Sequence, residues 1–376
     1  MLKSLLHLET NPHRVFGLDV LRAAAILFVV LEHADFLLPA KYRFITRYVV
    51  FDGVTIFFVL SGFLIGGILI RELEHHEPDG ALLLHFWKRR WMRTLPNYFL
   101  ILVVLLLLHL FFTPGFNTVE HWRYFLFAQN LNSPHPYFFA EAWSLCVEEW
   151  FYLALPVLMG LLLRGGHLSV KRALLLSAVL MLLFAVGMRV LHFYTIPVTD
   201  QKTWDLVFRK QVSTRFDSLM IGVAAAWVTF YFPSKWRQHR FVFLFCGLAL
   251  LLFSRFVAPL WFDVSSFYNG VLSFLVGSLG TVLLLPLLSE WKANASIPAK
   301  VITHISLISY SMYLLNLSVL QYWVIDRLPW QWVGLEGLGL GVLKYGTLWV
   351  LVLLSATLLY QYFELPMMKR REKSLK

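Results

Sequence analysis

Long runs of apolar residues recur along the whole chain and limit the possible folds more than any other feature of the sequence. Turn-rich breaks such as TPGFN, NSPHP and RGGHLS separate the runs. A helix of about 20 apolar residues crosses the hydrocarbon core of a bilayer. The ten runs lie at residues 17–38, 49–70, 94–113, 141–163, 172–191, 216–232, 241–258, 267–288, 304–325 and 338–362. We therefore predict an all-α polytopic membrane protein with about ten transmembrane helices.

The composition agrees with this fold class and argues against several others. The chain is 59% hydrophobic and 15% charged, whereas soluble domains carry about 25% charged residues. The net charge of +11 does not indicate a nucleic-acid partner, because the basic residues fall between apolar runs rather than in an aromatic-interleaved patch. Cys146 and Cys246 offer no metal-ligand spacing. We expect one transmembrane domain over residues 1–376, with no appended soluble domain, no metal and no permanently bound cofactor.

The distribution of basic residues predicts how the chain is oriented. An even number of spans puts both termini on one side of the membrane. The segments on that side carry 20 Lys and Arg residues, and the opposite segments carry 11. Cytoplasmic loops carry such an excess, so we predict that both termini are cytoplasmic. The opposite segment 189–216 is basic against this trend, with 5 Lys and Arg residues.

Arg22 and His33 interrupt the first apolar run, GLDVLRAAAILFVVLEHADFLLP. A cation in hydrocarbon costs on the order of 2.5–3.5 kcal/mol, so such residues are functional candidates. Eleven residues make slightly more than three helical turns, which places both side chains on one face, roughly 16 Å apart. This spacing suggests a long anionic ligand threading inward from Arg22. Alternatively, Arg22 pairs with Asp19, and His33 hydrogen-bonds a neighbouring helix.

A second basic cluster, HFWKRRWMRTLP, precedes the third span. Arg90 and Arg93 are three residues apart and therefore lie on one helix face. The guanidinium fork matches phosphate geometry, so both are candidates for binding a phosphorylated ligand. The alternative is topological anchoring with a Trp belt, which would account fully for Lys88 and Arg89.

The fourth span carries a polar stripe. Its members at helical spacing are Glu141, Ser144, Glu148 and Tyr152. Glu149 lies off this stripe. Such a stripe faces protein or a water-filled cavity rather than lipid. It builds either a site or a structural hydrogen-bond network between helices.

His33 needs an orienting group if it acts as a base. Its neighbours Glu32 and Asp35 point about 100° and 200° away around the helix. The partner must therefore come from another helix, and we expect either Asp52, at the outer end of the second span, or Glu148.

Taken together, these motifs resemble the acyltransferase-3 family of integral membrane acyltransferases. The resemblance rests on an Arg-x10-His first span followed by FFVLSGFL, RRWMR and WSLCVEEWFY, and then by TRFDSLMIG, SLISYSMYLLN and YFELPMMKRR. It covers nearly the whole chain. One departure is Asn316, which stands where many members carry a second histidine.

The resemblance implies an enzyme of the cytoplasmic (inner) membrane that moves an acyl group, usually acetyl, from cytoplasmic acyl-CoA to a hydroxyl of an extracytoplasmic glycan. Arg22, Arg90 and Arg93 would hold the phosphates of the donor. His33 would be the general base, or would carry the acyl group covalently, with Asp52 and Glu148 beside it.

Three residues are candidates for the acceptor. Asn316 inherits the position of the second histidine. Arg215 and Asp217 start the sixth span at its outer end and are either acceptor contacts or a local ion pair. The identity of the glycan or small-molecule acceptor and the length of the acyl chain stay open.

Two other kinds of protein compete with this interpretation. His and Glu inside membrane helices also build the proton relays of transporters. However, the sequence has no inverted repeat and no matched pair of Gly/Pro-broken helices. A purely structural scaffold would leave Arg22 and His33 on one face without an explanation.

Overall fold

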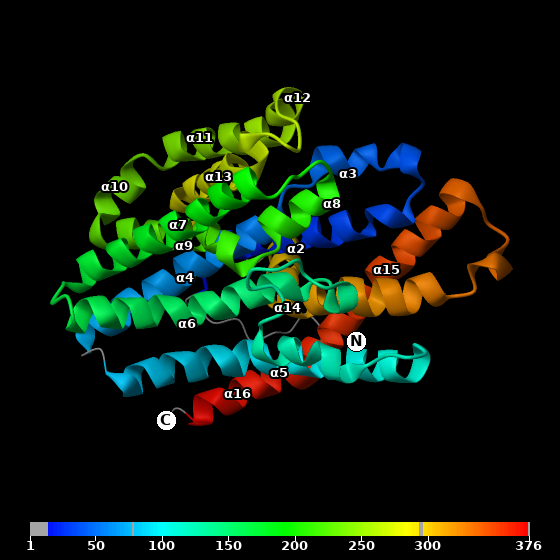
Figure 1. Ribbon diagram of the computed structural model, residues 1–376, viewed down its shortest axis with the longest axis horizontal. Coiled ribbons are helices and arrows are strands. Elements are labelled where there is room, and N and C mark those ends of the chain that lie inside the picture. Colours follow the sequence, from blue (N-terminus) through cyan, green and yellow to red (C-terminus); the bar gives the residue numbers. More distant parts are fainter. Residues whose placement is uncertain (1–13, 77–78, 293–295, 375–376) are drawn as a thin grey trace.

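The computed structural model describes residues 14–76, 79–292 and 296–374, and over these residues the chain forms helices and no strand (Figure 1). The long helices are α2 (Phe16–Ala34), α4 (Gly53–His75), α5 (Gly80–Phe112), α6 (Ala142–Arg164), α7 (Val170–Thr195), α9 (Phe216–Tyr231), α11 (Arg240–Leu252), α13 (Ser273–Leu288), α14 (Ile297–Leu315) and α15 (Gly337–Leu359). Short helices connect or extend them: α3 (Phe44–Val49), α8 (Gln201–Trp204), α10 (Pro233–Gln238), α12 (Ala258–Trp261) and α16 (Leu365–Ser374). The all-helical prediction is confirmed.

The long helices fall at the ten predicted spans. Within the described ranges, eight helical segments are long and apolar enough to cross a membrane. The other two are α2, which carries Asp19, Arg22 and Glu32, and α9, which has only 16 residues. Both run inside the bundle beside longer helices (Figure 1). The polytopic class is therefore confirmed, while the sidedness of the termini stays a prediction.

The third span starts earlier than predicted. We expected it to begin at residue 94, but α5 begins at Gly80, where the Asp79 carboxylate caps the helix by accepting the Leu82 N–H at 2.7 Å. At 1.5 Å per residue, its 33 residues reach about 50 Å, beyond a hydrocarbon core of about 30 Å. The hydropathy of the sequence predicted only the apolar part of α5. The preceding basic stretch is helical too, and its arginines therefore sit on a rigid element.

Several helices change to π geometry. The π segments are η5 (Asp205–Arg209), η7 (Phe253–Val257), η8 (Tyr268–Leu272), η9 (Asn316–Val324) and η12 (Tyr360–Glu364). Such segments are frequent at functional sites. The sequence analysis did not anticipate them. η9 matters most here, because it begins at Asn316.

The centre of the bundle is formed by α2, α4, α9 and α14. α11 and α13 lie along one edge, and α5 and α16 lie along the opposite edge (Figure 1). Glycines let α4 and α9 approach closely: a Cβ at Gly62 would overlap the Leu219 carbonyl oxygen, and one at Gly222 would overlap the Val59 carbonyl oxygen. This close packing keeps the short helix α9 in the interior.

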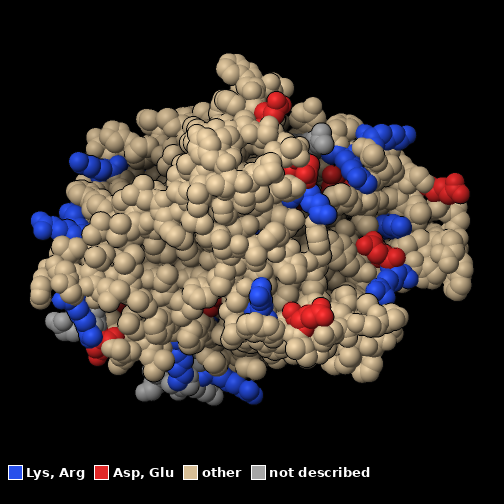
Figure 2. All heavy atoms as spheres, in the orientation of Figure 1, with Lys and Arg blue, Asp and Glu red and all other residues tan. Residues whose placement is uncertain are grey.

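Charged side chains gather toward the two ends of the helices. On the face in Figure 2, Lys and Arg dominate one end, both signs mix toward the other, and a wide belt between them is nearly free of charge. Such a belt is the surface expected against lipid. The basic end holds the α4–α5, α6–α7 and α9–α11 turns, and we call it the predicted cytoplasmic end.

Candidate active site

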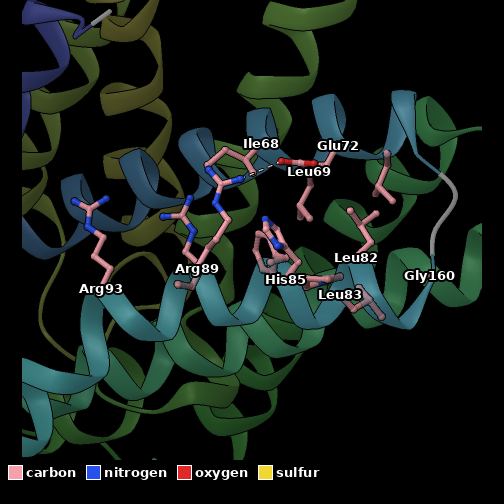
Figure 3. Close-up of a pocket in the computed structure, with 13 residues that line it drawn as sticks. Ile68, Leu69, Glu72, Leu82, Leu83, His85, Arg89, Arg93 and Gly160 are labelled. Atoms are coloured by element: carbon pink, nitrogen blue, oxygen red, sulfur yellow. Dashed lines mark hydrogen bonds and ion pairs between the residues drawn. The ribbon is translucent and has the colours of Figure 1, made fainter. Parts of the chain in front are cut away.

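A cavity of about 230 Å³ opens between α4, α5 and α6 at the predicted cytoplasmic end. We call it the entrance cavity. Apolar residues of α4, α5 and α6 make up most of its wall, together with Glu72 of α4 and with His85 and three arginines of α5. Figure 3 shows Arg89 and Arg93 projecting from α5 toward α4, where Arg89 pairs with Glu72 at 3.2 Å.

A second cavity of about 130 Å³, the inner cavity, continues deeper into the bundle. Arg90 and Arg93 line both cavities. The inner cavity is also lined by polar groups of other helices: Arg22, Ser61, Thr94, Ser144, Glu148, Tyr152, Ser309, Tyr310 and Tyr313. The two cavities together form a path from the predicted cytoplasmic end toward the middle of the protein.

The three predicted arginines meet at this path. Arg90 and Arg93 are neighbours on one face of α5, and α2 brings Arg22 to the same wall. The sequence alternative for Arg22 also holds in part, because its Nη1 lies 3.8 Å from Asp19. Asp19, however, is bound more closely by Arg14, with Nη2 to Oδ1 at 2.6 Å. Three guanidinium groups on one cavity suit a ligand with several negative charges.

Three of the four stripe residues, Ser144, Glu148 and Tyr152, line the inner cavity. Tyr152 donates its hydroxyl hydrogen to Glu148 at 3.3 Å, and Ser61 lies 2.8 Å from the same hydroxyl. Glu141 precedes α6 and instead binds the backbone N–H and hydroxyl of Ser318. The stripe therefore lines the inner cavity over about two helical turns and makes a structural contact at its outer end.

Glu149 faces away from this wall, as its angular position predicts. Its carboxylate accepts hydrogen bonds from Trp91 at 3.1 Å and Thr94 at 3.0 Å. It therefore joins α5 to α6, which fixes the helix that carries Arg90 and Arg93.

His33 has a partner that differs from both candidates. Its Nδ1 lies 2.6 Å from Oδ1 of Asn316. The expectation of Asp52 or Glu148 as the orienting group is therefore wrong for this structure: Glu148 bonds to Tyr152, and Asp52 caps α4. His33 is half-buried and does not line either cavity. Tyr313, three residues before Asn316, is one of the residues that line the inner cavity.

Arg209 bridges the outer ends of two helices near His33, and sequence reasoning missed it. Its guanidinium lies 3.3 Å from Asp52 and from Asp205, and 3.8 Å from Glu32. Asp52 also accepts hydrogen bonds from the Thr55 N–H at 3.1 Å and from the Thr55 hydroxyl at 2.8 Å. An ionic cluster therefore covers the outer ends of α2 and α4. The unusual basicity of residues 189–216 was its only sequence signal.

Arg215 and Asp217 lie in the interior. Both side chains are fully buried. Asp217 pairs with Arg189 at 2.6 Å, and Arg215 donates to the Thr55 hydroxyl at 3.0 Å. Asp217 therefore forms an ion pair at the start of α9, but its partner is Arg189 and not Arg215. Neither residue lines the two cavities or reaches the surface, so the geometry gives no direct support to acceptor binding.

Metal chemistry has no obvious site in the part of the chain that the structure describes, because no group of three or more His, Cys, Asp or Glu side chains there could hold an ion. The chemistry available to the path is that of clustered cations and of two carboxylates, Glu72 and Glu148, while the His33 imidazole, held by an amide, lies outside both cavities.

Comparison with known proteins identifies a matching family model and several relatives of similar sequence. The family model for acyltransferase-3, described as an acyltransferase domain, matches residues 15–363. A peptidoglycan O-acetyltransferase OatA of Listeria monocytogenes is 31% identical over 295 residues, covering 71% of this chain and 43% of that protein. An O-acetyltransferase OatA of Staphylococcus aureus is 27% identical over 398 residues, covering 97% of this chain and 59% of that protein. The chain thus spans about half the length of these relatives. Among solved structures there is no significant match.

Proposed function

Because the chain belongs to the acyltransferase-3 family, we propose that it is an O-acyltransferase of the cytoplasmic membrane, which moves an acyl group from cytoplasmic acyl-CoA to a hydroxyl of an extracytoplasmic glycan. Acetyl is the proposed group and glycan the proposed acceptor, because the relatives are named O-acetyltransferases and one is named for peptidoglycan.

The observation that carries this proposal is the convergence of Arg22, Arg90 and Arg93 on one path. The donor is a polyanionic head on a long, thin arm that ends in a thioester. The arginines would bind its phosphates, since guanidinium–phosphate pairs are strong and often bidentate. The arm would then run along α2 toward His33, about 16 Å beyond Arg22.

At the reacting end, His33 would act as a general base. The acceptor oxygen attacks the thioester carbonyl carbon, the hydroxyl proton passes to the imidazole, and the carbon–sulfur bond breaks. The proton then neutralises the departing CoA thiolate. A positioned base contributes about 10²–10⁴-fold to the rate. In the alternative route, His33 first takes the acyl group itself.

The direct test is acyl transfer by purified protein. We expect the protein in nanodiscs to release CoA thiol from acetyl-CoA and to acetylate a peptidoglycan fragment as the first acceptor tried. His33→Ala should lower turnover by at least about a hundredfold while donor binding persists, because the imidazole acts at the thioester and not at the phosphates.

The matched control is His304→Ala. His304 is also a half-buried histidine on a spanning helix, but it contacts Thr357 at 3.2 Å, away from the cavities. Its loss should leave turnover near wild type. Normal turnover by a folded His33→Ala protein would remove the general-base role. A protein that couples solute movement to protons and never consumes acetyl-CoA would instead be a transporter.

A further inference from the structure

The contact between His33 and Asn316 joins two residues 283 positions apart and fixes where hydrogen atoms can lie. Nδ1 of His33 is 2.6 Å from Oδ1 of Asn316. Asn316 is fully buried, at the point where α14 passes into the π segment η9. Water therefore cannot form hydrogen bonds with its side chain, and every polar atom of the amide needs a partner within the protein.

The orientation of the Asn316 amide follows from its other two contacts. Its NH₂ group donates to the carbonyl oxygen of Met312 at 3.0 Å and to that of Tyr313 at 2.7 Å. Carbonyl oxygens only accept hydrogen bonds. Turning the amide over would set its own oxygen against both carbonyl oxygens and lose both bonds, so the oxygen must be the atom that faces His33.

This orientation decides the tautomer of the imidazole. An amide oxygen only accepts, so the hydrogen in the 2.6 Å contact belongs to Nδ1 of His33. A neutral imidazole carries a single N–H, which leaves the lone pair on Nε2. Among the described residues Nε2 has no hydrogen-bond partner. It is also absent from the fully buried polar atoms that lack a partner, so it is not closed off by the protein. It is therefore the nitrogen that remains open to a reactant.

We propose that Asn316 is a positioning residue that holds neutral His33 in the Nδ1–H tautomer, so that Nε2 takes the proton of the acceptor hydroxyl. This inference rests on the proposed role of His33. The proton enters at Nε2 as the new carbon–oxygen bond forms, and it leaves from Nε2 to the CoA thiolate as the carbon–sulfur bond breaks. Asn316 touches neither substrate. Orienting the base replaces the acceptor contact that we expected for it.

The first test measures the tautomer in the wild-type protein. Nitrogen-15 chemical shifts of labelled histidine distinguish a protonated ring nitrogen from an unprotonated one, and the His33 signals are those lost in His33→Gln. We expect Nδ1 to be protonated and Nε2 to be unprotonated when the ring is neutral. The reverse tautomer would overturn the proposal. This readout does not depend on activity, so the expected tautomer in a protein that transfers no acyl group would count against the proposed function alone.

The second test compares two amide deletions. Asn316→Ala should abolish the preference for Nδ1–H and lower kcat by roughly tenfold to a hundredfold, the loss typical of removing the group that orients a metal-bound histidine, with an unchanged KM for acyl-CoA. Asn130 is the control, because its amide is also fully buried and donates to two carbonyl oxygens, Trp143 at 3.1 Å and Lys210 at 2.6 Å.

Asn130→Ala should therefore keep both the His33 tautomer and the kcat of the wild type. An Asn316→Ala protein with wild-type tautomer and kcat would refute the positioning role, as would equal losses of kcat in the two variants. If Asn316→Ala does not fold, the measurement on the wild-type protein still decides the question.

Discussion

At the scale of single residues, Arg90 and Arg93 are the sharpest test of the donor site. They lie where the two cavities meet, and neither takes part in the ion pairs found among the described residues. Arg90→Ala and Arg93→Ala should each weaken CoA binding by about 1.5–3 kcal/mol, or roughly tenfold to 150-fold, because each removes a charge-assisted phosphate contact. Calorimetric titration of the purified protein with CoA measures this loss.

Arg237→Ala is the control for charge alone. Arg237 is exposed at the same end of the molecule and pairs with Glu290 at 3.0 Å, outside both cavities. Its removal should leave CoA affinity unchanged. If the two cavity variants bind CoA as well as Arg237→Ala does, the arginines serve another ligand.

The residues differ in how far the sequence could predict their positions. Arg22, Arg90 and Arg93 meet because topology places the start of α2 and the first half of α5 at one end, and the order of the spans contains that information. The partner of His33 depends on the rotation of α14 about its axis and on the π segment that begins at Asn316. Apolar periodicity specifies neither, so the sequence left Asp52 and Glu148 as the expected partners.

At the scale of elements, the contact between α4 and α9 depends on Gly62 and Gly222. A Cβ at position 222 would overlap the Val59 carbonyl oxygen, a backbone atom that cannot rotate away. Gly222→Ala should therefore force the two helices apart and destabilise the protein by about 1–3 kcal/mol, the usual cost of overpacking. Thermal unfolding, measured by fluorescence-detected size-exclusion chromatography, should show a lower Tm than that of the wild type.

Gly187→Ala provides the matched comparison. Gly187 lies within α7, and an added Cβ there would meet nothing within 4 Å. Alanine in a helix should then leave stability unchanged or raise it by about 0.4–1 kcal/mol. Equal Tm values for the two variants would show that α4 and α9 do not pack as closely as the structure places them.

Element positions were easier to predict than element ends. Each predicted span contains a helix, because the cost of unpaired backbone groups in lipid makes an apolar run helical. α5 nevertheless starts 14 residues before its predicted span, because a helix continues into the interface wherever capping and propensity allow. The π segments follow from tertiary packing, which a single sequence does not display.

At the scale of the whole molecule, burial explains the basic segment that opposed the predicted orientation. Residues 189–216 hold 5 of the 11 Lys and Arg residues on the predicted outer side. Arg189 and Arg215 are fully buried, and Arg209 is largely buried against carboxylates. Loop charges orient a membrane protein, whereas these three arginines form internal ion pairs and hydrogen bonds. Setting them aside leaves 8 outer cations against 20, a stronger bias in the predicted direction.

The last prediction concerns this orientation, on which transfer across the membrane depends. In a protein with Cys146 and Cys246 replaced by alanine, single cysteines at the exposed positions Tyr137 and Thr199 should react with an impermeant maleimide in intact cells. Cysteines at the exposed positions His75 and Gln238 should react only after permeabilisation, because they lie at the basic end with the entrance cavity. Trp236, in the same turn, is buried and unsuitable as a probe. The opposite labelling pattern would mean that Arg90 and Arg93 lie on the side of the membrane away from cytoplasmic acyl-CoA. A donor bound at the entrance cavity could then not supply a glycan on the other side.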